Sequence, residues 1–267
     1  MGERDFANTD SVRSTRRHKA PSWALTLLEV PRALSEATSL LPARSILNKL
    51  EPGDGHAVMT LPGFLASGRS MRLVRRYLRK WGYNAYCWDM GRNLGLTHEF
   101  DLEVMLTSRL KELNDSSGRR VSLVGWSLGG LFARELARRN PECVRSVITM
   151  GSPIGNPKAT NAWRLYERVS GTRVDDAYIR HRVKSVREPI DGVPMTAIFS
   201  HSDAIVSSDI AMLPPGPLVE NVGVTASHIG MGYNPSVLFA IADRLLQTPE
   251  TWEPFDMSGL RKLFYHH

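Results

Sequence analysis

Apolar and polar residues alternate along most of the chain in a way that predicts strands and helices in turn. Short apolar runs predict the strands, and apolar residues repeated at helical spacing predict the helices between them. We expect strands at 57–61, 84–88, 121–125, 144–150, 194–199 and 218–224, and helices at 70–81, 100–113, 128–139 and 236–246. This order is typical of an α/β domain in which a mostly parallel sheet of about six strands has helices on both faces.

The N-terminal part of the chain lies outside this alternation. Residues 1–20 are polar and basic, and we expect a mobile arm there, followed by one domain over residues 21–267. The segment 21–50 predicts one or two helices. We expect Pro31 and Pro42 to break them, because proline lacks the N–H group that a helix interior needs.

The strongest signal of chemistry is a serine between a predicted strand and a predicted helix. The sequence GWSLGG at 125–130 directly follows the apolar run 121–124 and directly precedes a helical segment. Such a turn holds the serine hydroxyl above the edge of the sheet, and the glycines remove Cβ atoms that would clash. The N–H group of Leu128, at the start of the helix, points toward a developing negative charge. We therefore interpret Ser127 as a nucleophile.

A serine of this kind needs an acid and a histidine, and both follow in the expected chain order. Asp203 comes after the strand predicted at 194–199, and His228 comes after the strand predicted at 218–224. His201 is the alternative base, but it shares a loop with the acid, whereas the base should follow a later strand. Three further acids lie in a region without strands and are weaker candidates than Asp203: Asp175, Asp176 and Asp191.

These three side chains predict acyl chemistry. His228 takes the proton of Ser127 as the hydroxyl attacks an acyl carbonyl, and Asp203 holds the imidazole in one tautomer. An acyl-enzyme forms, and water or another nucleophile resolves it.

A second donor to the oxyanion is expected from a loop after an early strand. The strand predicted at 57–61 ends in the sequence PGFL at 62–65, where Gly63 permits close approach of the backbone. We predict the N–H group of Phe64 as this donor, with that of Leu65 as the alternative. An ordinary turn is the other interpretation of the loop.

Together these residues resemble the α/β-hydrolase superfamily, in particular bacterial esterases and lipases of the triacylglycerol-lipase type. The similarity spans about 57–246 and is strongest at 125–130, 151–155, 203–206 and 227–228. The resemblance implies the α/β-hydrolase fold, a Ser-His-Asp triad and hydrolysis of carboxylic esters without a cofactor. One departure is that many lipases carry His-Gly before the oxyanion donor, where this chain has Pro-Gly at 62–63. The hydrogen bonds that steady this loop must therefore differ.

The predicted strands stop between 157 and 190, where helices are expected over 160–169 and 174–186. In this fold such an insertion often forms a lid, and we interpret it as a small helical cap over an acyl pocket. An ordinary pair of packing helices is the alternative. We expect a small-molecule ester or lipid substrate with a medium-length acyl chain. Its predicted contacts come from the cap, the oxyanion loop and the serine turn: Leu65, Trp126, Trp163 and Tyr166.

The composition of the chain bears on its expected cellular location and on whether it needs a cofactor. The chain has 267 residues, 42% of them hydrophobic. It contains neither an apolar run of about 18 residues nor a signal-peptide pattern, so we expect a cytoplasmic protein without a membrane span. Its two cysteines, Cys87 and Cys143, are too few for a disulfide framework. Cysteine and histidine residues show no metal-ligand spacing, so neither a metal nor another cofactor is expected.

The formal net charge is +7, and part of the surplus lies in the N-terminal arm and in the helix predicted at 70–81. A solvated basic face is one interpretation, and weak contact with an anionic membrane surface is another. Aromatic residues do not interleave with these charges as a base-stacking surface requires, so no nucleic-acid partner is expected. The sequence predicts no particular oligomeric state.

Three other functions fit parts of this pattern. An acyltransferase or a cofactor-free perhydrolase would use the same triad with a different acceptor. An amidase or a lactonase would attack a different acyl carbon. A non-catalytic binding protein on a hydrolase scaffold usually lacks a triad residue, whereas this chain retains all three.

Overall fold

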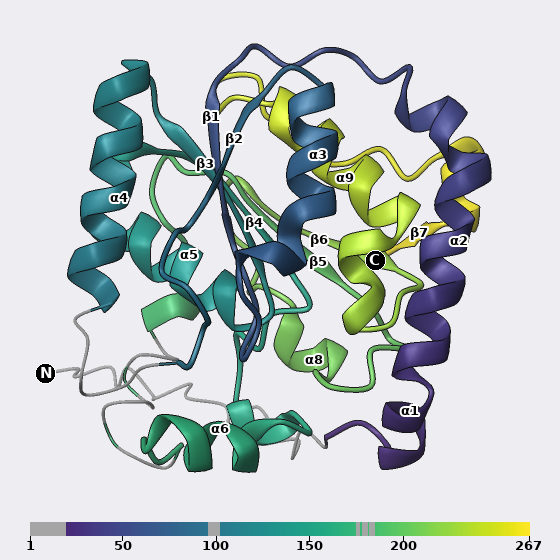
Figure 1. Ribbon diagram of the computed structural model, residues 1–267. Coiled ribbons are helices and arrows are strands. Elements are labelled where there is room, and N and C mark those ends of the chain that lie inside the picture. Colours follow the sequence, from purple (N-terminus) through teal and green to yellow (C-terminus); the bar gives the residue numbers. More distant parts are fainter. Residues whose placement is uncertain (1–19, 96–101, 175–176, 178–180, 182–184) are drawn as a thin grey trace, which may run out of the picture.

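The computed structural model describes residues 20–95, 102–174, 177, 181 and 185–267 of the chain. These residues form a sheet of seven strands in the order β2-β1-β3-β4-β5-β6-β7 (Figure 1). The first six strands are parallel to one another, and the last is antiparallel to its neighbour β6. The strands are β1 (Ala57–Leu61), β2 (Asn84–Cys87), β3 (Val121–Trp126), β4 (Val144–Met150), β5 (Met195–Phe199), β6 (Val219–Val224) and β7 (Tyr265–His266).

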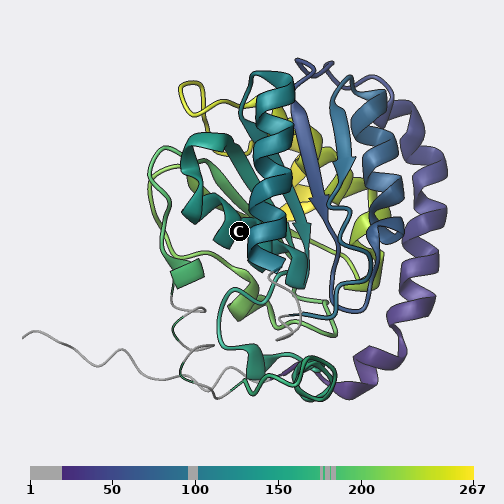
Figure 2. The same ribbon diagram turned by 60° about the vertical axis from the view of Figure 1, so that its left-hand side comes forward.

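Helices cover both faces of the sheet (Figures 1 and 2). Helices α4 (Leu102–Ser117) and α5 (Leu128–Arg139) pack on one face. Helices α3 (Arg72–Lys80) and α9 (Pro235–Leu246) pack on the other face, with α2 (Glu29–Leu47) outside them. The described residues also form the shorter helices α1 (Trp23–Leu27), α6 (Trp163–Ser170) and α8 (Ser208–Ala211). This is the α/β architecture that the alternation of the sequence predicts.

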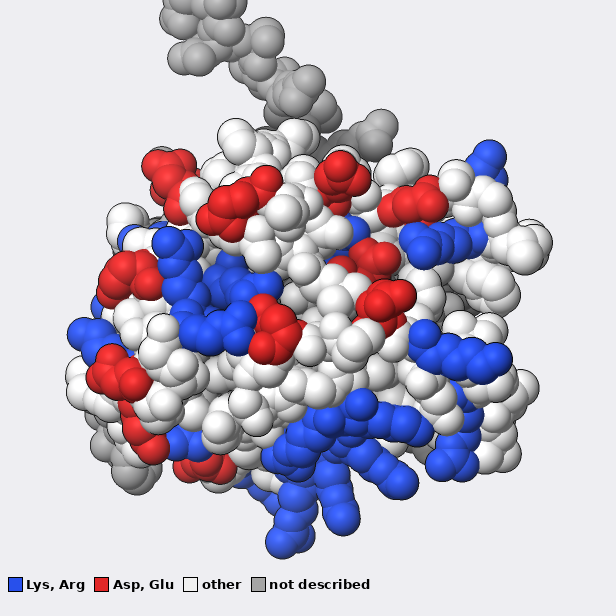
Figure 3. Space-filling view, turned by 90° about the horizontal axis from the view of Figure 1, so that it is seen from above, with Lys and Arg blue, Asp and Glu red and all other residues white. Residues whose placement is uncertain are grey.

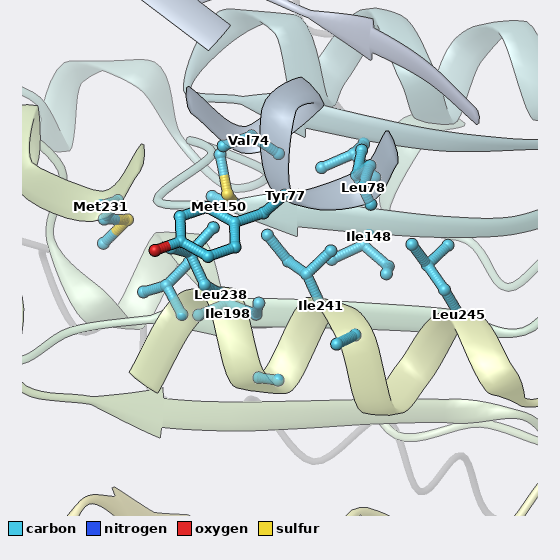
Figure 4. Packing of buried hydrophobic residues seen from close by; sticks show 14 of the residues in the cluster. Val74, Tyr77, Leu78, Ile148, Met150, Ile198, Met231, Leu238, Ile241 and Leu245 are labelled. Carbon is cyan, nitrogen blue, oxygen red and sulfur yellow. The ribbon is translucent and has the colours of Figure 1, made fainter. Parts of the chain in front are cut away.

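Two buried clusters hold these layers together. Val58 of β1 belongs to the cluster beneath α3 and α9, while its neighbour Met59 belongs to the cluster beneath α4 and α5. This division follows from the strand geometry, because successive side chains point to opposite faces of a sheet. Figure 4 shows the first cluster, in which Leu78 of α3 and Ile241 of α9 approach Ile148 of the sheet. Packed helices therefore cover both faces of the sheet. A binding or catalytic site is then expected at the ends of the strands.

The six expected strands are all present, and the structure adds one more. β7 is only two residues long and pairs with the outer edge of β6, where Gly223 lies opposite His266. Two residues are too few to show a period in the sequence, so the alternation of apolar and polar residues gives no sign of this strand.

The predicted break at Pro42 is wrong. α2 continues through this proline from Glu29 to Leu47. Buried Leu40 and Leu47 anchor the helix on either side of it, which offsets the loss of one backbone hydrogen bond. The other proline, Pro31, lies in the first turn of α2, where an N–H group has no partner within the helix.

The region without strands, 157–190, contains α6 where a helix was expected over 160–169. Figure 1 shows α6 beneath the sheet, beside the ends of the strands. The second expected helix, 174–186, lies largely outside the described residues, and so does the basic arm at 1–19. None of the described helices has the length and apolar character needed to cross a lipid bilayer.

Basic side chains gather along one side of the face that Figure 3 shows. On α3, Arg72, Arg76, Arg79 and Lys80 are exposed to solvent. Arg75 is buried instead, and its guanidinium donates to Thr60 Oγ1 at 2.9 Å and to the Gly68 carbonyl at 2.7 Å. One of the five charges expected on this helix therefore belongs to the interior.

Candidate active site

Ser127 occupies a strained turn between β3 and α5. Its φ of 53° and ψ of −124° lie outside the regions that L-residues favour, as expected for a serine held above a strand end. A Cβ atom on Gly125 would run into the backbone of Gly130, and one on Gly129 would run into that of Leu61. Close backbone packing around the turn thus requires the first two glycines of the GWSLGG sequence, while a Cβ on the third, Gly130, would meet the Ser152 side chain.

Asp203 and His228 form a buried pair at the same edge of the sheet. They follow the carboxyl ends of β5 and β6, and the Asp203 Oδ2 to His228 Nδ1 distance is 2.7 Å. The other carboxylate oxygen, Oδ1, accepts the N–H groups of Ile205 and Val206 at 2.8 Å each. Because an ionised carboxylate only accepts, Nδ1 of His228 carries a proton, and in the neutral ring Nε2 is left as an acceptor.

The charge of this pair is set by its surroundings. His228 is only 5% exposed and Asp203 only 4%. Burial lowers the pKa of His228, but the nearby carboxylates of Asp203 and Glu29 outweigh it, so the pKa lies above its ordinary value of 6.5. The imidazole thus holds a proton more strongly than a free histidine does.

The loop that carries His228 is attached to the serine turn. Trp126, which precedes Ser127, donates its indole N–H to the His228 carbonyl at 3.1 Å, and the two rings lie 5.8 Å apart between centroids. On the acid side, a Cβ on Gly151 would lie 3.0 Å from Asp203 Oδ2. The structure therefore brings the predicted nucleophile, acid and base to one edge of the sheet.

The loop after β1 lies against the same turn. A Cβ on Gly63 would lie 3.1 Å from that of Ser127, so the PGFL loop approaches the serine as closely as its glycine allows. The Leu65 N–H already donates to the Asn93 carbonyl at 2.7 Å. Leu128 begins α5, so its N–H group is among those that a helix leaves without an internal partner. Phe64 and Leu128 thus remain the predicted oxyanion donors, while the alternative, Leu65, is engaged elsewhere.

Asn93 holds this loop in place, and sequence reasoning missed it. The residue is 1% exposed, and its side chain donates to the Pro62 carbonyl at 2.8 Å and accepts the Gly95 N–H at 3.1 Å. Its backbone N–H donates to Ala66 at 2.8 Å. These bonds steady the loop that carries Pro-Gly where many lipases have His-Gly. The only sequence signal was the glycine-rich context of Asn93.

An apolar cavity opens beside Ser127. It measures about 820 Å³ including its open mouth, within the range of ligand pockets in proteins. Phe64 and Leu128 line it, as do Trp163 and Tyr166 from α6, and the rings of Phe64 and Tyr166 lie 5.3 Å apart. Further residues that the sequence did not single out as contacts also line it: Leu131, Phe132, Pro153, Pro157, Thr160, Ala162, Val174, Val186, Ile205 and Val206.

Two predicted substrate contacts lie elsewhere. Among the described residues that line the cavity, neither Leu65 nor Trp126 is present. Trp126 packs against the cluster on the opposite face and beside His228, because side chains alternate along β3. Leu65, with a φ of 61°, is bound through its backbone to the Asn93 loop. Both residues support the site's framework.

The rival groups have other partners. His201 is exposed, its Nδ1 lies 3.0 Å from Ser208 Oγ, and its ring stacks on His266. Asp191 is also exposed, while Asp175 and Asp176 lie outside the described residues. In the part of the chain that the structure describes, no group of three or more His, Cys, Asp or Glu residues is arranged to hold a metal ion.

A model of the alpha/beta hydrolase fold family matches residues 38–237, which include the serine turn, the acid and the base. The chain belongs to this family. A search of curated protein sequences gives no significant match.

Solved structures share the fold of this α/β hydrolase at low sequence identity. MGS-MChE2, an alpha/beta hydrolase from a sediment metagenome of the Mar Chica lagoon in Morocco, is 22% identical with a TM-score of 0.51, over 73% of this chain and 92% of its own. Bacillus licheniformis lipase BlEst2 is 18% identical with a TM-score of 0.53, over 74% and 94%. Aspergillus fumigatus lipase B is 17% identical with a TM-score of 0.56, over 77% of this chain but 57% of its own.

Proposed function

We propose that this α/β hydrolase cleaves carboxylic esters through an acyl-enzyme on Ser127, with His228 as the base and Asp203 as the acid that orients it. The observation that carries the proposal is the strained serine turn beside an apolar cavity, at the sheet edge where Asp203 and His228 form a buried pair. Two of the similar structures are named lipases, which agrees with this activity.

The reaction proceeds in two halves. The Ser127 hydroxyl attacks the ester carbonyl, and its proton passes to Nε2 of neutral His228. The N–H groups of Leu128 and Phe64 stabilise the tetrahedral oxyanion, which collapses as His228 returns the proton to the departing alcohol. Water then gives its proton to His228, attacks the acyl-enzyme and releases the carboxylic acid, and Ser127 regains its proton.

The cavity supports an apolar substrate. Its lining residues offer hydrophobic contact on the side of α5 and of α6, and we expect an acyl chain bound to Ser127 to contact Trp163 and Tyr166. We propose that α6 and its neighbours act as the cap of this pocket. Esters with a medium-length acyl chain fit the apolar character of this space better than charged or short polar ones.

The test combines turnover and labelling. Ser127→Ala should lower kcat for p-nitrophenyl esters by about a million-fold, by analogy with other serine triads, and should abolish labelling by a fluorophosphonate probe. Ser116→Ala, which changes an exposed serine on α4, should retain both signals. Unchanged hydrolysis in the Ser127→Ala protein would refute the proposal. Product analysis with added alcohol or peroxide separates hydrolysis from acyl transfer.

A further inference from the structure

Helix α2 presents three charged side chains to the two loops that carry Asp203 and His228. The helix runs along the outside of the molecule, at the right-hand edge of Figure 1. Glu29, Arg32 and Glu36 are three and four residues apart, so they share one face of the helix. All three precede residue 38, where the match to the family model begins.

Glu29 joins the acid loop to the base loop. Its side chain is 2% exposed, Oε1 accepts the N–H of Ala204 at 3.0 Å, and Oε2 accepts the N–H of Ile229 at 2.9 Å. Ala204 directly follows Asp203 and Ile229 directly follows His228. One carboxylate therefore fixes the distance between the backbones of the acid and the base.

Arg32 and Glu36 bind the residues that directly precede the acid and the base. Arg32 donates to the carbonyl and to the hydroxyl of Ser202, at 2.6 and 2.7 Å, directly before Asp203. Glu36 accepts the N–H of Ser227 at 2.6 Å, directly before His228. Each chain neighbour of the acid and of the base is thus bonded to a side chain of α2.

Packing alone does not explain a carboxylate in this position. A buried charge is costly unless hydrogen bonds or an opposite charge compensate it, and an apolar side chain would fill the same space without that cost. Glu29 is compensated by the two backbone N–H groups and by Arg32, whose Nη1 lies 4.0 Å away. The buried carboxylate of Glu29 is explained if the protein needs it to set the relative position of the two loops.

We propose that α2 is a clamp for the catalytic pair and that Glu29 is its central positioning residue. This inference rests on the proposed function. Glu29 touches backbone groups next to Asp203 and His228 and does not line the described cavity, so it acts through them and not on the substrate. Its negative charge also favours the protonated form of His228.

The decisive variant is Glu29→Gln, which keeps the shape of the side chain. A glutamine can accept from one of the two backbone N–H groups but turns its own NH₂ toward the other. We expect kcat to fall by about tenfold to 100-fold with KM changed less than about twofold, because a misplaced acid–base pair harms the chemical step. The acidic limb of the pH–rate profile should move to lower pH.

A second variant separates position from charge. The charged groups that act on His228 are Asp203 and Glu29, with Arg32 and Glu36 on the same face of α2. Arg32→Met removes the hold on Ser202 but leaves the negative charge of Glu29. It should lower kcat without moving the acidic limb to lower pH. Leu34→Gln, on the exposed side of the helix, is the matched control and should leave both measurements unchanged.

An NMR titration of the His228 ring in the full chain gives a readout that needs no substrate. In the Glu29→Gln protein we expect the ring to titrate at lower pH than in the wild type or the Leu34→Gln control. If wild-type ester turnover is absent, the proposed function fails, while this titration still tests the clamp. Wild-type kcat together with an unmoved titration in Glu29→Gln would overturn it. If that variant does not fold, a wild-type kcat in Arg32→Met overturns it.

Discussion

Among the described residues, a serine, a histidine and an aspartate lie at each of two opposite edges of the sheet: Ser127, His228 and Asp203 where the parallel strands end, and Ser122, His56 and Asp54 where they begin. At the amino edge, His56 Nδ1 lies 2.5 Å from Asp54 Oδ1, and its Nε2 lies 2.8 Å from the hydroxyl of Ser122. This set has the same connectivity as a catalytic triad. Ser122, however, is the second residue of β3, is 0% exposed and also bonds Ser146 at 3.0 Å. Connectivity alone therefore does not make a nucleophile; a strained turn, access and oxyanion donors are also needed.

The two imidazoles also differ in charge. Burial lowers the pKa of His56 below its ordinary value; the hydrogen bond that the ring donates to Asp54 opposes this shift, and the cations Arg145 and Arg119 add to it. The same two arginines bind Asp54, so its charge is shared. The second oxygen of Asp203, in contrast, accepts the uncharged backbone N–H groups of Ile205 and Val206, which leaves its charge available to His228. Burial and the two arginines thus favour the neutral ring of His56, whereas the carboxylates of Asp203 and Glu29 raise the pKa of His228.

The largest expected effect comes from exchanging each histidine for leucine. His228→Leu should lower kcat for p-nitrophenyl esters by about a million-fold, because the serine loses its base. His56→Leu should keep the kcat of the wild type in the folded fraction. Comparable losses of kcat in both variants, measured well below their melting temperatures, would mean that the amino-edge set takes part in the reaction.

The next largest expected effect concerns the PGFL loop at 62–65, which lies beside the carboxyl-edge set. Asn93→Ala removes the side-chain bonds to Pro62 and Gly95 and loosens the segment that presents the Phe64 N–H. We expect kcat to fall by about tenfold to 100-fold with little change in KM. This loss is smaller than the largest loss of kcat that follows from removing an oxyanion donor completely. Asn84→Ala is the control, because Asn84 bonds the Gly55 carbonyl at the amino edge. Equal kcat in the two variants would argue against Phe64 as a donor.

The amino-edge set should matter for stability. His56→Leu removes the buried hydrogen bond to Ser122 and the partly buried one to Asp54, and it leaves Ser122 bonded to Ser146 alone. This should lower the free energy of unfolding by about 1–3 kcal/mol. Adding Ser122→Ala should recover part of this loss, since it removes the hydroxyl that has lost one of its two partners, the His56 ring. Urea unfolding of the two single variants and the double variant measures the coupling. Purely additive effects would show that the His56–Ser122 contact contributes nothing.

The residues of the carboxyl-edge site differ in how far the sequence reveals them. Ser127 stands in a short pattern whose glycines are required by the turn itself, and chain order then points to Asp203 and His228. Glu29 binds the backbone N–H groups of two distant loops, and Asn93 binds the distant Pro62 carbonyl, and such contacts leave no period or spacing in the chain. In a helix that also carries exposed charges, Glu29 looks like a solvated residue. The sequence also does not reveal to which face of the sheet Trp126 points, because this depends on the residue at which β3 ends.

The smallest expected effect is a difference in how the two histidines link pH to stability. The folded pKa of His56 lies below the ordinary 6.5, so on acidification the unfolded chain binds this proton first and stability falls as the pH drops below that value. The folded pKa of His228 lies above 6.5, so its contribution is complete below 6.5 and is lost as the pH rises through the folded pKa.

Urea unfolding from about pH 5 to about pH 8 should therefore separate the two leucine variants. His56→Leu should flatten the acidic side of the stability curve, and His228→Leu should flatten the side above 6.5. The wild-type rate should follow the same logic, with kcat/KM decreasing as the pH falls through the raised pKa of His228, because only the neutral ring accepts the serine proton. If both variants flatten the same side of the stability curve, the two imidazoles do not differ in charge. The two sets of residues then differ in the strained turn and the cavity alone.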